Sequence, residues 1–419
     1  MTSITQDIKN ICQSCKLAQR QISNLDNDIK NKILNKISQL ITQNTTKIIN
    51  ANQIDLANAK KNGLNQAKID RLTLNEERIN SIINSIKEVI KLDDPTNKVT
   101  YNAARDNGLN IKRISTPIGI ILAIYESRPN VTSDIASLSI KSGNVALLRC
   151  GSDSINSSSI IANLYRTALQ EFNIDPNCVT LIGNPDRKYI DALLKMDQYI
   201  DVVIPRGGKS LIKAISKKSK IPLFKHLDGN CHCYVNESCA FDKARKIIIN
   251  AKMRRVGICG ATESLVIDKK ISQQIIPLIC DDLTNYDCEI VGDLASQKID
   301  PRIKKASNSD FATEYLDKKI SVKIVRNISE AINHINKYSS NHTESIITQD
   351  QKAADKFLKE IDSAIVMHNA STQFADGGEF GMGSEVGIST GKLHARGPVG
   401  VEQLTTYKYI ISANCAIRK

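Results

Sequence analysis

Short apolar segments alternate with helical patterns between residues 118 and 219, and this alternation constrains the fold more than any other feature of the chain. The apolar segments predict strands at 118–124, 145–149, 179–182 and 202–204. Helical patterns follow them at 132–142, with Thr132 as the expected N-cap, and at 154–172, 187–196 and 210–219. Such an alternation predicts a parallel, doubly wound α/β sheet, which binds ligands beyond the carboxyl ends of its strands.

Two groups lie at that edge of the predicted sheet. Arg149 ends the second strand, and Gly207-Gly208 precede the helix after the fourth strand, where backbone N–H groups can bind phosphate. No G-x-G-x-x-G follows the first strand, so the standard Rossmann fingerprint is absent. Gly208-Lys209-Ser210 is similar to the end of a P-loop, but Val203 occupies the position of the required upstream glycine. An ATPase is therefore excluded.

The segments before the sheet have simpler patterns. Residues 1–92 carry apolar side chains at helical spacing, and Asn75 followed by two glutamates predicts the start of the last helix in this segment. Residues 101–116 contain Asn107-Gly108 between extended flanks, a pattern typical of a β-hairpin. We expect packing helices followed by a hairpin.

A cysteine lies in a glycine-rich loop in the second half of the chain. An amphipathic helix begins near Phe241 and ends in Arg254-Arg255, the loop Gly257-Ile258-Cys259-Gly260 follows, and an apolar strand comes next at 265–267. Positive charge beside a sulfur favours the thiolate, and small neighbours leave room for a substrate. For a single cysteine the alternative is a buried small residue. The loop is a candidate nucleophile site.

Composition narrows the class of protein. Hydrophobic residues make up 41% of the 419 residues, and no apolar run reaches the length of a membrane span. The N-terminus lacks the apolar core of a signal peptide, and eleven scattered cysteines are typical of a reducing compartment, so we expect a cytoplasmic protein. Neither Cys12/Cys15 nor Cys231/Cys233 has a second pair at a zinc-like distance, so we predict no metal site.

The net charge of +13 raises the question of nucleic-acid binding. Lysines are spread along every predicted helix, aromatic residues make up only 4% of the chain and there is no Trp, so few side chains could stack on bases. A solvated basic surface that attracts anionic substrates is favoured over a non-catalytic basic protein that binds RNA. We expect neither nucleic-acid nor membrane partners.

Six separated blocks, in order along nearly the whole chain, resemble the gamma-glutamyl phosphate reductases of the aldehyde dehydrogenase superfamily. The blocks are PIGIILAIYESRPNVTSD from Pro117, IKSGNVALLR from Ile140, DVVIPRGG from Asp201, HLDGNCHCYV from His226, the Cys259 loop, and EFGMGSEVGISTGKLHARGPVGVEQLTTYKYI from Glu379. The resemblance implies an aldehyde dehydrogenase-like fold, with two doubly wound α/β domains and a protruding β-hairpin oligomerisation element.

The resemblance also divides the chain. It implies N-terminal helices and a dinucleotide-binding domain in residues 1–225, a catalytic domain in 226–365, and a return to the cofactor domain in 366–419. The hairpin at 101–116 is expected to pair with a last strand near 405–411 and to form the contact of a homo-oligomer.

The family implies roles for particular residues. Cys259 matches the nucleophile, and Asn130 matches an asparagine that stabilises the oxyanion together with the Cys259 backbone N–H. With a nicotinamide dinucleotide implied, Gly207-Gly208 are expected near its phosphates, and Arg149 near a 2′-phosphate, which favours NADPH. Glu314 matches a glutamate that hydrogen-bonds the nicotinamide ribose. The alternatives are a turn residue for Asn130 and surface residues for Arg149 and Glu314.

Four cationic residues are expected to meet the substrate. Arg254 and Arg255 would receive a departing phosphate or favour the Cys259 thiolate, although helix C-terminal cations need no such role. His394 and Arg396, in the glycine-rich final block, suit an acidic substrate.

The implied reaction is NADPH-dependent reduction of L-glutamyl 5-phosphate to L-glutamate 5-semialdehyde through a Cys259 thioester, in proline biosynthesis, with functional coupling to a glutamate 5-kinase. Hydrolytic aldehyde dehydrogenases carry a general-base glutamate, and residues 226–230 contain none, which favours keeping the thioester for hydride. The alternative is another thioester-forming aldehyde dehydrogenase, hydrolytic or CoA-acylating.

Overall fold

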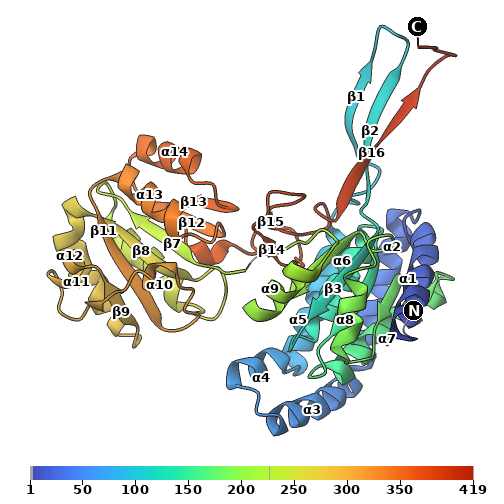
Figure 1. The fold of residues 1–419 in the computed structure, drawn as a ribbon, viewed down its shortest axis with the longest axis horizontal. Helices are drawn as coiled ribbons and strands as arrows, with labels where there is room; N and C mark the ends of the chain where they lie inside the picture. Colours follow the sequence, from blue (N-terminus) through green and yellow to red (C-terminus); the bar gives the residue numbers. More distant parts are fainter. Residues whose placement is uncertain (1–2, 226, 419) are drawn as a thin grey trace. The chain divides into compact units, whose positions relative to one another are not determined.

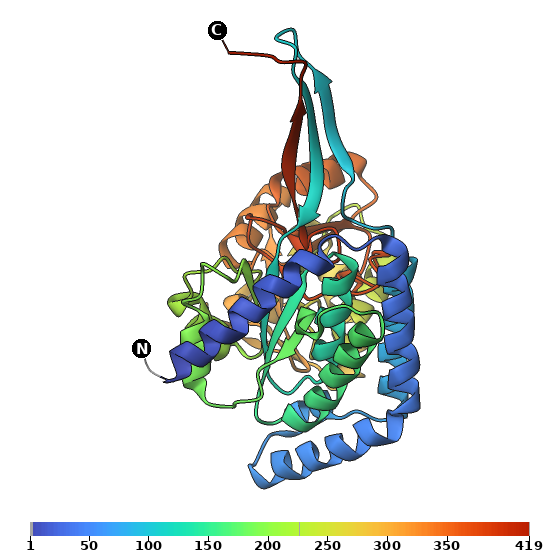
Figure 2. The ribbon, with the colours of Figure 1, turned by 90° about the vertical axis from the view of Figure 1, so that its right-hand side faces the viewer.

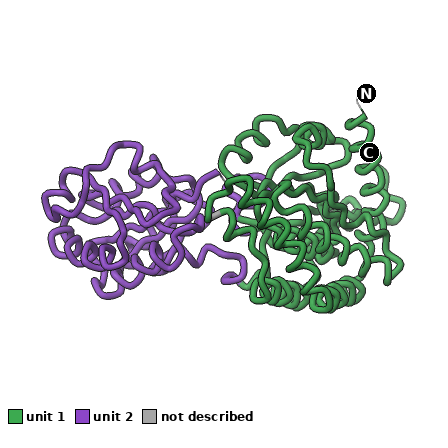
Figure 3. Tube along the Cα trace, turned by 90° about the horizontal axis from the view of Figure 1, so that it is seen from below, with its two compact units in different colours: residues 1–225, 381–387, 399–419 green, residues 226–380, 388–398 purple. Residues whose placement is uncertain are grey.

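The computed structural model describes residues 3–225 and 227–418, which form two compact units (Figure 3). Unit 1 comprises Met1–Lys225, Gly381–Gly387 and Val399–Lys419, and unit 2 comprises His226–Phe380 and Ile388–Pro398. Within the described ranges, no helix combines the length and the apolar character that a membrane span requires.

The division of the chain differs from the expected one in its last part. Residues 366–380 and 388–398 belong to unit 2, whereas we expected them in the cofactor domain. The reason is packing, because β13 (Ile365–His368) pairs with the sheet of unit 2, and Ala375 and Ile388 join Ile365 and Met367 in one hydrophobic cluster.

Unit 1 contains nine α-helices and seven strands among its described residues. The helices are α1 (Ser3–Ile22), α2 (Asn27–Gln43), α3 (Thr45–Lys61), α4 (Gln66–Leu72), α5 (Glu76–Lys91), α6 (Asn130–Lys141), α7 (Ile155–Glu171), α8 (Arg187–Leu193) and α9 (Lys209–Lys218). The strands are β1 (Val99–Ala104), β2 (Asn110–Pro117), β3 (Ile120–Tyr125), β4 (Val145–Cys150), β5 (Val179–Leu181), β6 (Val202–Arg206) and β16 (Thr405–Ser412).

A four-stranded parallel sheet forms the centre of unit 1. Its strand order is β5-β4-β3-β6, and all neighbouring strands are parallel, as the alternating sequence pattern predicted. Strand β3 is labelled in Figure 1. Every residue of β3 and β4 is buried, as a parallel sheet with both faces covered requires. Helices α6 and α7 pack beside the sheet, and α2, α3 and α5 pack on them.

Two predicted helix starts had different outcomes. Asn75 caps α5 as predicted, because its side-chain oxygen accepts a hydrogen bond from the Arg78 backbone N–H at 2.9 Å. The Thr132 cap was wrong, because α6 already begins at Asn130, directly after Pro129, whose φ of −63° is helical. The Thr132 hydroxyl instead lies 2.7 Å from the Tyr125 hydroxyl.

The hairpin projects from the rest of unit 1 together with the last strand (Figures 1 and 2). Strand β2 pairs antiparallel with β1 on one edge and with β16 on the other. In the second pairing Thr405 lies opposite Pro117 and Ser412 opposite Asn110, so the last strand pairs with the hairpin as predicted. The outer strands β1 and β16 are mostly exposed.

Unit 2 is a second α/β unit. Its strands are β7 (Cys231–Val235), β8 (Thr262–Asp268), β9 (Glu289–Gly292), β10 (Lys304–Lys305), β11 (Lys319–Val325), β12 (Thr343–Ile347), β13, β14 (Ile388–Ser389) and β15 (Gly397–Pro398). Its helices are α10 (Phe241–Met253), α11 (Lys269–Thr284), α12 (Leu294–Gln297), α13 (Ile328–Tyr338) and α14 (Gln351–Glu360).

A seven-stranded parallel sheet, in the order β10-β9-β11-β8-β7-β12-β13, runs through unit 2. Successive side chains of a strand point to opposite faces, and β8 follows this rule. Leu265 and Ile267 pack in a cluster with residues of α10 and α11, whereas Val266 packs with residues of α13 and α14. Both faces of the sheet are therefore covered by helices, as in a doubly wound fold.

Candidate active site

Cys259 lies in the tight connection between α10 and β8. A backbone hydrogen bond from Ala261 N–H to Ile258 O, 3.0 Å long, closes the turn around it. The side chain is partly buried and packs against the cluster of Ile365, Met367, Ala375 and Ile388. The nucleophile candidate is therefore neither sealed in a core nor fully exposed.

The Cys259 backbone is packed so closely that its neighbours must be small. A Cβ added to Gly229 would lie 2.1 Å from the Cys259 carbonyl oxygen, far inside van der Waals contact. The Cys231 thiol donates to the same oxygen at 3.1 Å. On the other side, a Cβ on Gly260 would lie 3.1 Å from the Thr372 carbonyl oxygen. The segments before β7 and after β13 thus fix the loop.

Arg254 and Arg255 follow α10 and are both exposed. The Arg254 Nε donates to Gln373 Oε1 at 2.9 Å, and Gln373 Nε2 donates to the Ala251 carbonyl at 2.9 Å. The buried amide of Gln373 thereby joins the end of α10 to the segment after β13. Among the residues that the structure describes, none forms a hydrogen bond or ion pair with the Arg254 terminal guanidinium nitrogens, which can therefore bind an anion.

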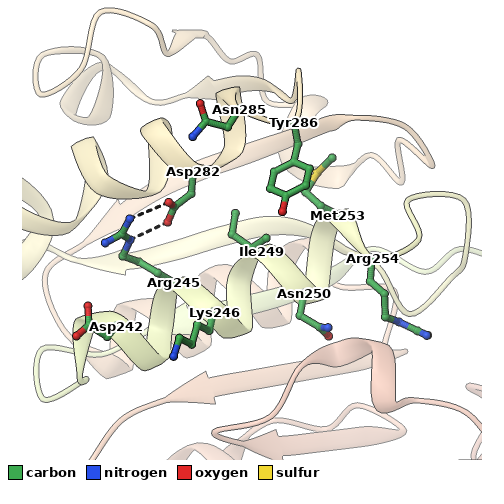
Figure 4. A pocket seen from close by; sticks show the side chains of 10 residues that line it. All are labelled: Asp242, Arg245, Lys246, Ile249, Asn250, Met253, Arg254, Asp282, Asn285 and Tyr286. Carbon is green, nitrogen blue, oxygen red and sulfur yellow. Dashed lines mark hydrogen bonds and ion pairs between the residues drawn. The ribbon is translucent and has the colours of Figure 1, made fainter.

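A surface hollow of about 970 Å³ lies along α10 and α11, and Figure 4 shows Arg254 at the end of the row of α10 side chains that line it. Arg245 lines the same hollow but is bound by two hydrogen bonds to Asp282, at 2.7 and 2.8 Å. Cys259 does not line this hollow. The nucleophile candidate therefore lies outside this hollow.

Glu314 lies beside the nucleophile loop. Its Oε1 accepts a hydrogen bond from the Gly229 backbone N–H at 2.8 Å, and Gly229 is the glycine that contacts Cys259. The structure therefore brings together two predicted site residues that lie 55 positions apart in the sequence.

His394 and Arg396 lie in the loop between β14 and β15, in unit 2. Arg396 Nη1 is 2.6 Å from Asp362 Oδ1, and Lys392 pairs with the same carboxylate. Hydrogen bonds from Lys392 and Arg396 lower the pKa of Asp362 to about 2. The positive charge of Arg396, which was expected to meet an acidic substrate, is thus neutralised by Asp362. The side chain of His394 is exposed to solvent.

The remaining candidates lie in unit 1, at the carboxyl ends of neighbouring strands. Asn130 follows β3, Arg149 is the penultimate residue of β4, and Gly207-Gly208 connect β6 to α9. Since β4, β3 and β6 are adjacent and parallel, the three groups share one edge of the sheet. This is the edge at which the sequence predicted a ligand.

The three groups at this sheet edge differ in their hydrogen bonds and burial. Asn130 Nδ2 donates to Asp134 Oδ2 at 2.9 Å, and burial raises the pKa of Asp134 to about 6. Arg149 is buried, its Nη2 donates to the Pro185 carbonyl at 2.7 Å, and burial lowers its pKa. Gly208 is the N-cap of α9 and offers no side chain to the first N–H groups of that helix.

Comparisons with known proteins show which family the chain belongs to. The model of the aldehyde dehydrogenase family matches residues 2–321. The chain belongs to the aldehyde dehydrogenase family. It is 46% identical over 416 residues to the gamma-glutamyl phosphate reductase of Brucella suis biovar 1 (strain 1330), covering 99% of both chains. It is 48% identical over 414 residues to that of Lachnospira eligens, covering 99% of this chain and 100% of the relative.

Comparison with solved structures gives the same result for the fold. The crystal structure of gamma-glutamyl phosphate reductase from Thermotoga maritima superimposes with a TM-score of 0.96 at 41% identity, covering 98% of this chain and 100% of that one. Glyceraldehyde-3-phosphate dehydrogenase GapN from Methanocaldococcus jannaschii, complexed with NADP, has a TM-score of 0.68 at 16% identity and shares the fold. The predicted resemblance and the predicted fold class are confirmed.

This aldehyde dehydrogenase also has site residues that the sequence did not reveal. Gln373, Gly229 and Cys231 contact the nucleophile loop or its arginine from distant positions, and no local pattern indicates such contacts. Lys252 and Glu263 form a fully buried ion pair on either side of the loop. The sequence signal for Glu263 is its place two residues before the predicted strand 265–267, because a carboxylate that is buried with a strand requires a partner.

Proposed function

We propose that this enzyme reduces L-glutamyl 5-phosphate to L-glutamate 5-semialdehyde and phosphate with NADPH, in proline biosynthesis. The observation that carries the proposal is similarity over the full length to relatives named gamma-glutamyl phosphate reductase, at 44–48% identity. The partly buried Cys259 in a tight glycine-rich loop supports a thioester mechanism. A kinase that phosphorylates the glutamate side chain would supply the acyl phosphate.

Cys259 is the proposed nucleophile. Its thiolate attacks the acyl carbon, the C–O bond to phosphate breaks, and phosphate leaves while the thioester forms. NADPH, when bound, supplies the hydride that reduces the thioester carbon. The C–S bond then breaks, so the aldehyde departs and the thiolate returns. Arg254 and Arg255, exposed at the end of α10, are the proposed receivers of the phosphate.

Both steps pass through an oxyanion, which requires aimed hydrogen-bond donors worth ~3 kcal/mol each in other enzymes. The Cys259 backbone N–H has no acceptor in the described part of the chain and is available for this task. Asn130 is the proposed second donor. Its Nδ2 group has two hydrogens, and Asp134 uses one of them.

The residues at the sheet edge of unit 1 suit a dinucleotide with a 2′-phosphate. Arg149 Nε is buried and has no hydrogen-bond partner among residues 3–225 and 227–418, so it retains a donor for an anion. The N-terminus of α9, a ten-residue helix behind Gly208, directs backbone N–H groups to the place proposed for a diphosphate. Glu314 is the proposed ribose ligand in unit 2. These residues support NADPH as the cofactor.

The reverse reaction tests the proposal. Wild-type enzyme is mixed with glutamate 5-semialdehyde and NADP⁺, with phosphate or CoA as acyl acceptor, and NADPH formation is followed. We expect a rate that requires phosphate and disappears in Cys259→Ala. A rate that CoA supports, or that needs no acceptor, would instead assign a CoA-acylating or hydrolytic dehydrogenase. Full activity of Cys259→Ala would refute the nucleophile.

We also propose a cytoplasmic homo-oligomer. The sheet β1-β2-β16 exposes large apolar side chains, which in a monomer would remain in water. These are Val99, Tyr101, Tyr407, Tyr409, Ile410 and Ile411. Their exposure supports a contact with a second copy of the chain. All eleven cysteines are free, which suits a reducing compartment.

A further inference from the structure

One ion pair is sealed inside unit 2 on either side of the nucleophile loop. Lys252 Nζ and Glu263 Oε2 are 2.5 Å apart, and both side chains are 0% exposed. Lys252 lies in the last turn of α10, which leads into the loop, and Glu263 lies on β8, which leaves it. The pair therefore connects the entrance of the Cys259 loop to its exit.

The same carboxylate holds the turn that carries Glu314. Glu263 Oε1 accepts a hydrogen bond from the Leu316 backbone N–H at 3.1 Å, and the Tyr315 ring lies 6.0 Å from Lys252 Nζ. Leu316 has a φ of 53°, a conformation that leucine rarely adopts, so this turn needs outside support. Glu314 itself reaches Gly229, which contacts Cys259. Lys252 and Glu263 are thus linked to Cys259 from two directions.

Stability does not explain why the pair is charged. Removing two charges from water costs several kcal/mol per ion, and well-packed apolar residues of similar volume are often as stable or more stable. Burial raises the pKa of Glu263 to about 7 even with Lys252 beside it. What apolar residues cannot supply is the acceptor that fixes the Leu316 N–H.

We propose that Lys252 and Glu263 are positioning residues. They hold the turn that carries Glu314 and the Cys259 loop at a fixed separation, so that the thioester carbon and the nicotinamide ring are aligned for hydride transfer. The inference rests on the proposed function. Because neither side chain is accessible, neither can touch substrate or cofactor. A shift of about 1 Å in such a geometry costs on the order of 100-fold in rate.

The decisive variant is the double substitution Lys252→Met with Glu263→Leu, which removes both charges and keeps the volume. The matched control is Lys30→Met with Asp94→Leu, which removes another pair with a fully buried lysine, in unit 1, at 2.9 Å. For each we would measure the melting temperature, kcat and the KM for NADP⁺ in the reverse reaction, and the rate at which iodoacetamide alkylates Cys259 without substrate or cofactor.

We expect the Lys252/Glu263 variant to melt within a few degrees of wild type, to lose at least tenfold in kcat with a raised KM for NADP⁺, and to change its alkylation rate at least threefold. The control should keep all kinetic values. A folded variant with wild-type kcat, KM and alkylation rate would overturn the proposal. If the double variant does not fold, two single variants test the proposal instead. Glu263→Gln keeps an acceptor for the Leu316 N–H and should retain most of the kcat, whereas Glu263→Leu removes the acceptor and should lose it. Equal kcat values of these two variants would also overturn the proposal.

The two proposals can fail separately. If wild-type enzyme does not act on glutamate 5-semialdehyde, the proposed function fails. The alkylation rate still tests the positioning of Cys259, because it depends on neither substrate nor cofactor.

Discussion

Gly229→Ala tests the packing of the nucleophile loop with a single methyl group. Gly229 does not have a positive φ, so alanine is compatible with its backbone conformation. The obstacle is steric, because the new Cβ would lie 2.1 Å from the Cys259 carbonyl oxygen and 2.7 Å from its Cα. Ordinary contact begins at 3.4 Å, so the two backbones must separate by about 1.3 Å (3.4 minus 2.1).

Two opposing effects set the change in stability. Replacing glycine by alanine reduces the entropy of the unfolded chain and stabilises by about 0.4–1 kcal/mol where the site accepts it. Overpacking a tight site costs about 1–3 kcal/mol. The steric term is larger, so we expect a net loss of about 1–2 kcal/mol, or on the order of 2–8 °C in melting temperature for a unit of this size.

The effect on rate should exceed the effect on stability. A displacement of about 1 Å at the nucleophile costs on the order of 100-fold in kcat, and the Gly229 N–H bond to Glu314 moves with it. Thermal unfolding and the reverse reaction measure the two effects. Gly183→Ala is the control, because nothing lies within 4 Å of its Cβ position. A Gly229→Ala enzyme with wild-type kcat would refute this account of the loop.

Three further predictions follow from unit 1. Arg149→Ala should raise the KM for NADP⁺ at least tenfold and that for NAD⁺ much less, because a 2′-phosphate loses its cation; equal effects in steady-state assays with both cofactors would contradict this. Burial raises the folded-state pKa of Asp134 to about 6 although Arg128 and Arg206 face it. The charged form therefore destabilises the fold, so Asp134→Asn should be more stable than wild type above pH 6, with a difference that disappears between pH 6 and pH 4. Urea unfolding at pH 8 and pH 4 would check this, and equal differences at the two pH values would refute it. Ile411→Lys should lower the molar mass measured by light scattering toward that of a monomer, because it places a charge on the exposed apolar sheet. An unchanged molar mass would show that β16 is not part of the contact between copies.

The sequence predicted the parts of the fold that local patterns determine. The apolar runs of β3 and β4 indicated strands buried on both faces, and Asn75 indicated a helix start, because each depends on neighbours in sequence. The prediction of Thr132 as the N-cap was wrong because the helix begins two residues earlier, at Asn130, directly after Pro129. The placement of residues 366–380 was wrong because pairing of β13 with β12 depends on tertiary contacts.

The candidate site was predictable only in part for the same reason. Cys259 and Gly207-Gly208 are recognisable from their immediate neighbours, since loops between strands and helices carry such residues. The Gln373 bridge to Arg254 spans 119 positions, and the contact of Gly229 with Cys259 spans 30. Nothing in a single sequence indicates pairings over such separations, because they depend on how the sheet brings its loops together.

The path of the chain between its units has a consequence for attempts to dissect the enzyme. The polypeptide passes from one unit to the other after residues 225, 380, 387 and 398. A single protease cut at any of these points leaves the halves joined by three covalent connections. A fragment that starts at residue 226 and stops at 380 lacks β14 and β15, and one extended to 398 carries seven residues that belong to the other unit. Neither unit can therefore be obtained as one uninterrupted piece of the gene, and any exchange of catalytic units between relatives must splice the chain at several places at once.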